Sequence, residues 1–218
     1  MPKTIIITES TENGVDKKLL SELIKCKISD SFLKSVKFIS SGSGSISDVR
    51  KELRTGLREA EFINGNVKNL LIIVDADENI ENRFEELKKS LLKNSNKSFN
   101  FPDKLNIIDK KNPEKINVGI FLFPDCKNKG SLETLCLEAL KHDKKDEKLD
   151  CVKNYFDCLQ GRGIDINKET ENNKSKSKFR VFMATPNPDH YVDSVIDYID
   201  LKSDVFNGVV DFIRKVDE

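Results

Sequence analysis

The fold is decided by residues 70–77, which read LLIIVDAD. Their five leading apolar residues, several of them β-branched, predict a strand that is buried on both faces of a parallel sheet. Asp75 and Asp77 follow at the carboxyl end of this strand, where open α/β sheets bind their ligands. Carboxylates held so close repel each other unless a cation, a proton or a hydrogen-bond donor lies between them. The pattern therefore predicts a Mg²⁺ site, and an Asp that only caps the following helix is the structural alternative.

Two further strands are predicted around this one, and each ends in an acid. Residues 3–8 (KTIIIT) form a β-branched run that stops at Glu9, and residues 116–123 (INVGIFLF) form a run that stops at Pro124 and Asp125. Strands and helical periodicity alternate, which predicts an α/β fold with a mostly parallel sheet and helices on both faces. Because the carboxyl ends of parallel strands lie at the same edge, the acids after these strands are expected to meet there.

More acids lie at the predicted starts of helices. The first predicted helix, which Thr11 or Asn13 could cap, carries Glu12 and Asp16 at its beginning, and a later helix carries Glu133 in its first turn. These acids are candidate metal ligands at the same edge. Their alternative role is a favourable interaction with the helix dipole, which needs no metal.

A small, flexible loop follows the short strand predicted at residues 36–39. Residues 40–47 read SSGSGSIS and precede a predicted helix, so their backbone N–H groups could bind a phosphate. The loop is neither a Walker A motif nor a G-x-G-x-x-G fingerprint, and a plain turn is the alternative. The candidate phosphate-binding residues are Ser41, Gly42, Ser43 and Gly44.

The composition indicates a globular protein with a heavily solvated surface. Lys plus Arg equals Asp plus Glu, at 37 each, so no global positive charge indicates nucleic acid. The five cysteines form no C-x-x-C pair, which argues against zinc. Met1 leads almost directly into a predicted strand, and no apolar run approaches the ~18 residues that a membrane span needs. We expect a cytoplasmic protein with reduced thiols and no membrane contact.

The chain is expected to form one domain over residues 1–218, with its core in about residues 1–140. Residues 168–178 read KETENNKSKSK, contain no apolar side chain and are predicted to be a flexible surface loop. Residues 179–218 are expected to close the fold with helices.

The placement of the acids resembles a known pattern. Glu9 at the end of a first strand, with Asp75 and Asp77 after a later apolar strand, resembles the TOPRIM pattern of topoisomerases, DnaG-type primases and OLD-family nucleases. TOPRIM proteins usually read Glu-Gly-x-x-Asp directly after the first strand. Here Glu12 and Asp16 keep that spacing, whereas Glu9 keeps the strand context. We favour Glu9 and keep Glu12 and Asp16 as alternates.

A second resemblance covers nearly the whole chain. Residues 118–125 (VGIFLFPD) and 130–138 (GSLETLCLE) are similar to an uncharacterised, TOPRIM-related family of bacterial proteins. That family typically shows G-hydrophobic-P-D-N, then G-x-L-E-D-L, then a lysine-led helical segment, here residues 178–184 (KFRVFMA). The resemblance implies a TOPRIM-like Rossmannoid three-layer sandwich.

The same resemblance implies a function and a site. It implies a Mg²⁺- or Mn²⁺-dependent nuclease, most simply one that hydrolyses DNA, with one or two ions activating water. The ligands it implies are Glu9, Asp75 and Asp77, with Asp125 and Glu133 around a second ion. It also places Lys178 near the scissile phosphate, as a catalytic residue.

Two other functions stay open. OLD-type nucleases carry an ATPase domain, but this chain has no Walker motif, so it could be a non-catalytic or partner-dependent module that acts with an ATPase protein. Haloacid-dehalogenase phosphohydrolases also place Asp-x-Asp after a strand. In that family the motif follows the first strand, whereas here it follows the third predicted strand, so this alternative ranks last.

Overall fold

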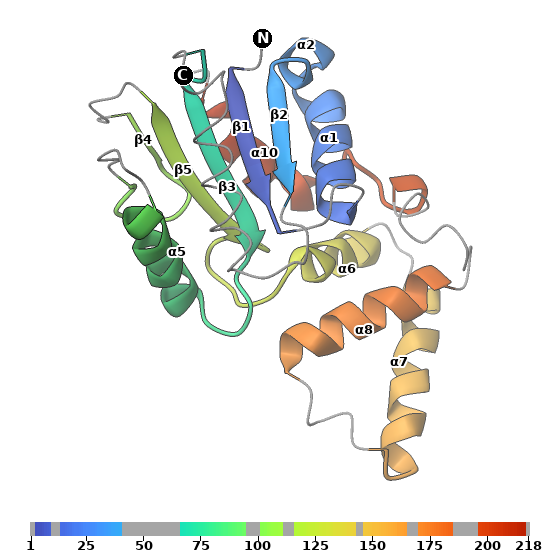
Figure 1. The fold of residues 1–218 in the computed structure, drawn as a ribbon. Coiled ribbons are helices and arrows are strands. Elements are labelled where there is room, and N and C mark those ends of the chain that lie inside the picture. Colours follow the sequence, from blue (N-terminus) through green and yellow to red (C-terminus); the bar gives the residue numbers. More distant parts are fainter. Residues whose placement is uncertain are drawn as a thin grey trace.

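The computed structural model is built on a five-stranded sheet with the strand order β2-β1-β3-β5-β4 (Figure 1). The strands are β1 (Thr4–Thr8), β2 (Val36–Ser40), β3 (Asn69–Asp75), β4 (Ile108–Asp109) and β5 (Asn117–Phe123). Neighbouring strands run parallel, except that β4 pairs antiparallel with β5 at one edge. The predicted α/β class with a mostly parallel sheet is confirmed. The two-residue strand β4 was not predicted.

The structure describes residues 3–9, 14–40, 66–94, 101–110, 116–142, 146–164, 170–184 and 196–216. None of the helices in these ranges is both long and apolar enough to cross a membrane. All five cysteines fall within these ranges, and each is a free thiol.

The central strand β3 is buried along its whole length, as its apolar run predicts. Its side chains alternate between two hydrophobic clusters, with Leu71 and Ile73 in one and Leu70 and Ile72 in the other. The alternation follows from the period of two in a strand, and both clusters need a cover of helices to exclude water.

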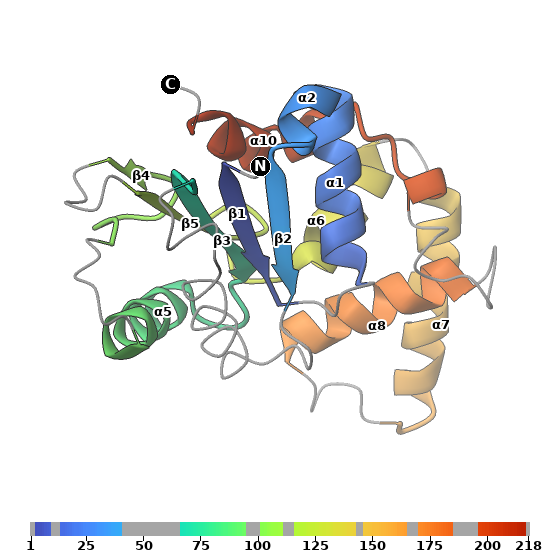
Figure 2. The same cartoon turned by 45° about the horizontal axis from the view of Figure 1, so that its top comes forward.

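Helices cover both faces of the sheet (Figures 1 and 2). The side chains of α1 (Val15–Lys27), α6 (Leu132–His142) and α10 (Asn207–Arg214) join the cluster that holds Leu71. On the opposite face, α5 (Ile80–Asn94) joins the cluster that holds Leu70. The sheet is therefore enclosed by helices on two sides, as predicted.

Two helices project from one end of the sheet, α7 (Asp146–Gly161) and α8 (Glu171–Ala184), and they pack against each other (Figure 1). The prediction of a flexible loop over residues 168–178 differs from this structure, in which the helix begins at residue 171. The Thr170 hydroxyl accepts a hydrogen bond from the N–H of Asn173 at 3.2 Å, which caps the helix. Three fully buried residues anchor its second half: Phe179, Phe182 and Met183.

The start of α1 also differs from the prediction. Gly14 occupies the N-cap position, and no side chain that the structure describes caps the helix. The predicted caps, Thr11 and Asn13, lie outside the described residues. Asp16 lies in the first turn, where an acid interacts favourably with the helix dipole. This places the Asp16 carboxylate near the carboxyl edge of the sheet.

Candidate metal centre

The candidate site lies at the carboxyl edge of the sheet, between β1 and β3. The chain leaves β1 to form β2 on one side and later returns to form β3 on the other side. Such a change of direction opens a crevice where α/β sheets bind ligands. Glu9 directly follows β1 and Asp75 ends β3, so both flank this crevice. Figure 1 shows the carboxyl ends of these strands directed toward α6 and α8.

Asp75 is buried and its two carboxylate oxygens have different partners. Oδ1 accepts a hydrogen bond from the backbone N–H of Leu132 at 3.0 Å, at the first turn of α6. Oδ2 accepts one from Lys176 Nζ at 2.8 Å, from α8. Asp75 thus connects the end of the central strand to two helices that are distant in sequence.

Asp16 and Glu133 join Asp75 in what we call the acid cluster, defined as these three residues. Burial raises the pKa of Asp16 to about 7, and the charges of Asp75 and Glu133 add to this effect. Burial also raises the pKa of Asp75 to about 6, against the opposing charge of Lys176. Near neutral pH the cluster therefore retains part of a proton in addition to the Lys176 ammonium.

Lys176 is the cation of the acid cluster. Burial alone would lower its pKa, but Asp75, Glu133 and Asp77 outweigh burial and raise it above the usual value. The ammonium therefore stays protonated. Among the residues that the structure describes, the three carboxylates of the acid cluster share the charge of Lys176, which leaves an excess of negative charge when all three are ionised.

Arg83, a buried residue in the first turns of α5, connects the ends of β1 and β3. Its guanidinium forms an ion pair with Glu9, and its Nη2 lies 3.5 Å from Asp77 Oδ2. Its Nε donates a hydrogen bond to the backbone oxygen of Asp75 at 3.1 Å. One planar side chain thus fixes two predicted metal ligands and the strand end between them.

Asp77 is held by its backbone. Its N–H donates to the carbonyl of Gly130 at 3.0 Å, and the N–H of Gly130 donates back at 2.9 Å. Asp77 adopts a φ of 55° and Gly130 a φ of 141°. Positive φ values are disfavoured for most side chains but are accessible to Gly and, more often than to other residues, to Asp. The exchange ties the loop after β3 to the loop before α6, so the two loops that carry acids form one unit.

Asp125 is placed differently from the other predicted ligands. Its carboxylate accepts hydrogen bonds from the backbone N–H groups of Lys127 and Asn128 and from the Asn128 side chain, at 2.7–2.9 Å. Burial alone would raise its pKa, but these hydrogen bonds hold it below the usual value. The structure gives Asp125 a role in its own turn, and its metal ligation stays a prediction.

The other predicted residues have varied positions. Lys178 lines a pocket between α6, α7 and α8, while Lys176, two residues earlier, reaches Asp75. Glu12 lies outside the described residues, as does the predicted phosphate-binding loop of Ser41, Gly42, Ser43 and Gly44.

The donor chemistry of the site fits a hard divalent ion. Carboxylate oxygens are the ligands that Mg²⁺ and Mn²⁺ prefer, and acids from β1, β3, α1 and α6 converge here. Within the described ranges, no three acidic, His or Cys side chains are arranged to ligate one ion as they stand. Lys176 and Arg83 supply the positive charge among these acids, and both contact residues that would have to turn toward an ion.

Sequence reasoning missed these two cations. A signal for Arg83 exists, because it shares the helix face of Ile80, Phe84 and Leu87, where a lone charge requires a buried partner. Lys176 gave no signal, since it lies in a polar run with lysines on either side.

Comparison with known proteins links the chain to one family. The family model described as "Protein of unknown function (DUF3226)" matches residues 6–217. No curated protein and no solved structure matches the chain. The matched range contains every residue of the acid cluster, together with Arg83 and Lys176.

Proposed function

The chain belongs to the DUF3226 family, whose function is unknown, and we propose that it is a divalent-metal-dependent nuclease of the TOPRIM type. The observation that carries this proposal is the acid cluster at the β1–β3 crevice. Two of its three carboxylates have pKa values raised to about 6 and about 7. Acids with raised pKa values in a crevice are typical of functional sites, because such an arrangement is costly to a fold that does not use it.

The order of the strands supports the TOPRIM-like part of the proposal. The acid after the first strand and the Asp-x-Asp after the central strand belong to neighbouring parallel strands, β1 and β3. Glu9 and Asp77 both contact Arg83, so the two halves of the motif come together at one residue. This favours Glu9 for the first acidic position, and the acid cluster gives Asp16 a further position in the same site.

The residues that would hold the ion are Asp75, with Asp16 and Glu133 beside it and Glu9 and Asp77 around Arg83. A bound Mg²⁺ or Mn²⁺ supplies positive charge that activates a water and stabilises the phosphate oxygens.

The chain's own residues orient the carboxylates of the site and supply positive charge to neutralise a phosphate. The Leu132 N–H fixes one oxygen of Asp75. Lys176 offers a protonated ammonium to a phosphate, because the neighbouring acids keep its pKa high. Arg83 holds Glu9 at the end of β1, beside the end of the paired strand β3.

A second candidate function is a non-catalytic or partner-dependent TOPRIM-like module, acting with an ATPase protein. Two ion pairs favour it: Arg83 already neutralises Glu9, and Lys176 already neutralises Asp75. In such a module the site would bind a partner or an ion without turning over nucleic acid.

A cleavage assay tests the proposal. Plasmid and linear DNA are incubated with Mn²⁺ or Mg²⁺ and with the wild type, Asp75→Asn/Asp77→Asn or the control Asp157→Asn/Asp197→Asn. The control removes two exposed carboxylates elsewhere, so the change in net charge is the same. We expect cleavage by the wild type and the control, and loss of cleavage in the Asp75/Asp77 variant.

Equal cleavage by all three proteins would refute the site. Absence of cleavage by all three, with Mn²⁺ still bound, would favour the partner-dependent module.

A further inference from the structure

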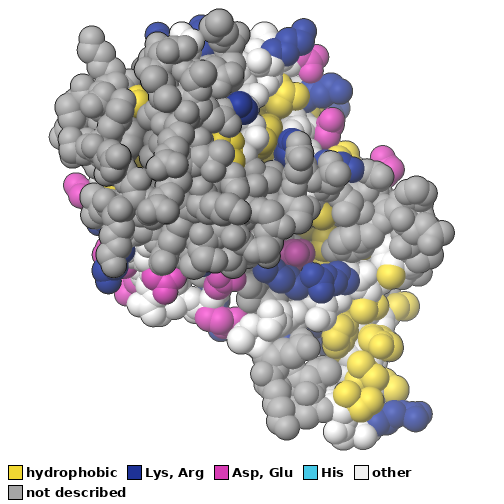
Figure 3. Space-filling view, in the orientation of Figure 1, with side chains coloured by type: hydrophobic (Ala, Val, Ile, Leu, Met, Phe, Trp, Pro, Cys, Tyr) yellow, Lys and Arg dark blue, Asp and Glu magenta, His cyan; other side chains and the backbone are white. Residues whose placement is uncertain are grey.

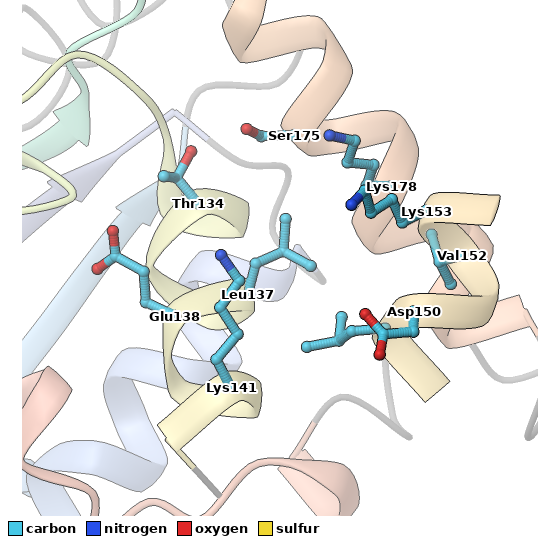
Figure 4. A pocket seen from close by; sticks show the side chains of 10 residues that line it. Thr134, Leu137, Glu138, Lys141, Asp150, Val152, Lys153, Ser175 and Lys178 are labelled. Atoms are coloured by element: carbon cyan, nitrogen blue, oxygen red, sulfur yellow. The ribbon is translucent and has the colours of Figure 1, made fainter. Parts of the chain in front are cut away.

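A pocket of about 320 Å³ lies between α6, α7 and α8, outside the acid cluster (Figure 4). Two hydroxyl side chains, Thr134 and Ser175, and three lysines line it, above leucine and valine side chains. Lysine and hydroxyl side chains commonly donate hydrogen bonds to phosphate oxygens in proteins that bind nucleic acids. The chemistry of the lining therefore suits a phosphate group.

The three lysines come from three helices. Lys141 comes from α6, Lys153 from α7 and Lys178 from α8, and Figure 4 shows them on both sides of the pocket that they line. In the described part of the chain, Lys153 and Lys178 form no ion pair. Like charges that gather without partners are unfavourable until an anion joins them.

The pocket keeps a positive balance although acids also line it. Among the described residues that line the pocket, two carboxylates, Glu138 and Asp150, are set against three ammonium groups, which leaves one net positive charge. Lys141 interacts with Glu138, whereas Lys153 and Lys178 are available.

The pocket adjoins the acid cluster through two helices. On α6, Glu133 belongs to the cluster and the next residue, Thr134, lines the pocket. On α8, Lys176 contacts Asp75, and its neighbour Ser175 lines the pocket. Figure 3 shows Lys and Arg side chains in a continuous band over α8. Positive charge that continues from a pocket along a helix suits a polyanion better than a single small anion.

We propose that this lysine pocket binds a phosphate of the nucleic-acid strand next to the phosphate at the acid cluster. The inference rests on the proposed function for the identity of the strand. It adds that the substrate is a polynucleotide, held by at least two phosphates, and it assigns Lys178 to strand binding at a place separate from Asp75.

The test measures binding of a fluorescently labelled single-stranded oligonucleotide by anisotropy, in EDTA so that no metal-dependent cleavage occurs. The pocket variant is Lys141→Gln/Lys153→Gln/Lys178→Gln. The matched control is Lys34→Gln/Lys89→Gln/Lys202→Gln, which removes three exposed lysines elsewhere and gives the same net charge.

We expect the pocket variant to lose about tenfold or more in affinity and the salt dependence of log K to become shallower by about 2. The control stays within about twofold of the wild type.

Equal weakening in both triple variants, or none in the pocket variant, would overturn the inference. AMP is the second probe: if it binds as tightly as the oligonucleotide and with the same lysine dependence, the ligand is a free phosphomonoester and the strand assignment is wrong. Lysine-dependent binding without any cleavage would leave this inference standing and count against the nuclease alone. Cleavage of DNA by the wild type, together with an unchanged oligonucleotide affinity in the pocket variant, would overturn this inference and leave the proposed nuclease standing.

Discussion

At the scale of single residues, Asp16 carries a negative charge that burial and neighbouring acids make unfavourable. It lies in the first turn of α1, partly buried, and its pKa is raised from 3.8 to about 7, chiefly by burial and then by Asp75 and Glu133. The folded protein therefore binds a proton that the unfolded chain has lost over this range. Stability falls as the pH rises from 3.8 to about 7 and is constant above it, as far as Asp16 contributes.

Replacing Asp16 tests this cost. In EDTA at pH 8, Asp16→Asn is expected to stabilise the fold by about 1–2 kcal/mol, after subtracting the lost helix-dipole interaction. At pH 4 the gain disappears. Urea unfolding at both pH values measures the effect, with the exposed Asp157→Asn as the control. Equal effects of the two variants at pH 8 would contradict the account.

Lys176 has the opposite role, because it neutralises Asp75 by an ion pair between α8 and the end of β3. Lys176→Met removes this charge and is expected to cost about 1–3 kcal/mol at pH 8. The loss shrinks at pH 5, where Asp75 and Asp16 are protonated and need the ammonium less. Thermal unfolding at both pH values measures the loss. The control is Lys178→Met, which lies on the same helix but has no ion pair with any described residue. A loss that does not depend on pH would show that packing, not charge, explains the effect.

At this scale the sequence predicts acids better than their partners. Glu9 and Asp75 were predicted to lie at the carboxyl edge of the sheet because each follows an apolar run, and the end of such a run can be read from the sequence. Lys176 could not be predicted, because an ion pair between residues 101 positions apart depends on tertiary packing. Arg83 was overlooked although its place on the apolar face of α5 indicated a buried partner. Asp125 shows the converse case, in which a strand-end acid is satisfied within its own turn.

At the scale of elements, the contact between β5 and α10 depends on one glycine. A Cβ at Gly119 would lie 2.8 Å from the ring of Phe212, which is fully buried on α10 and whose ring centroid lies 5.4 Å from that of Phe121. Gly119 therefore lets the helix approach the strand closely.

Gly119→Ala is expected to cost about 1–3 kcal/mol, because α10 or its phenylalanine must move. Gly208→Ala is the matched control on α10, where a Cβ meets nothing closer than 4.0 Å. That change is expected to be neutral or to stabilise by up to about 1 kcal/mol. Urea unfolding measures the free energy of unfolding of both variants. Similar values would contradict the close approach of α10 to β5.

Elements were predicted where their apolar residues form a run or a face, and misread where they do not. The continuous apolar run predicts β3, and the helical period of apolar residues predicts α6. Residues 171–178 of α8 are polar throughout, and the fixed half of the helix lies later, at Phe179 and Phe182. Tertiary contacts at one end and a Thr170 cap at the other make the polar half helical, and neither is visible in local composition.

At the scale of the whole molecule, zero net charge conceals a separation of charge. Acids collect at the β1–β3 crevice, and lysines line the pocket between α6, α7 and α8. Figure 3 shows further Lys and Arg side chains over α8. Composition could not predict this, because it depends on which helix ends meet at the carboxyl edge. A polyanion would meet the lysines first and present one phosphate to the acids.

The pH dependence of metal affinity follows from the same arrangement. Because an ion binds ionised carboxylates, Asp16 and Asp75 must release the protons that they retain near pH 7 and pH 6. The affinity for Mn²⁺ is expected to rise by up to about tenfold per pH unit between pH 6 and pH 7 and to level off above pH 8. Titrations across this range measure it, and an affinity that is constant with pH would contradict the role of Asp16.

The most direct test of the central claim is a calorimetric titration of Mn²⁺ into the wild type and into Asp75→Asn at pH 7. Two buffers with different ionisation enthalpies report the protons released. We expect the wild type to bind Mn²⁺ and release a substantial fraction of one proton, whereas Asp75→Asn binds at least about tenfold more weakly. Absence of binding by the wild type, or equal binding by both proteins, would show that the carboxyl edge of this sheet is not a metal site.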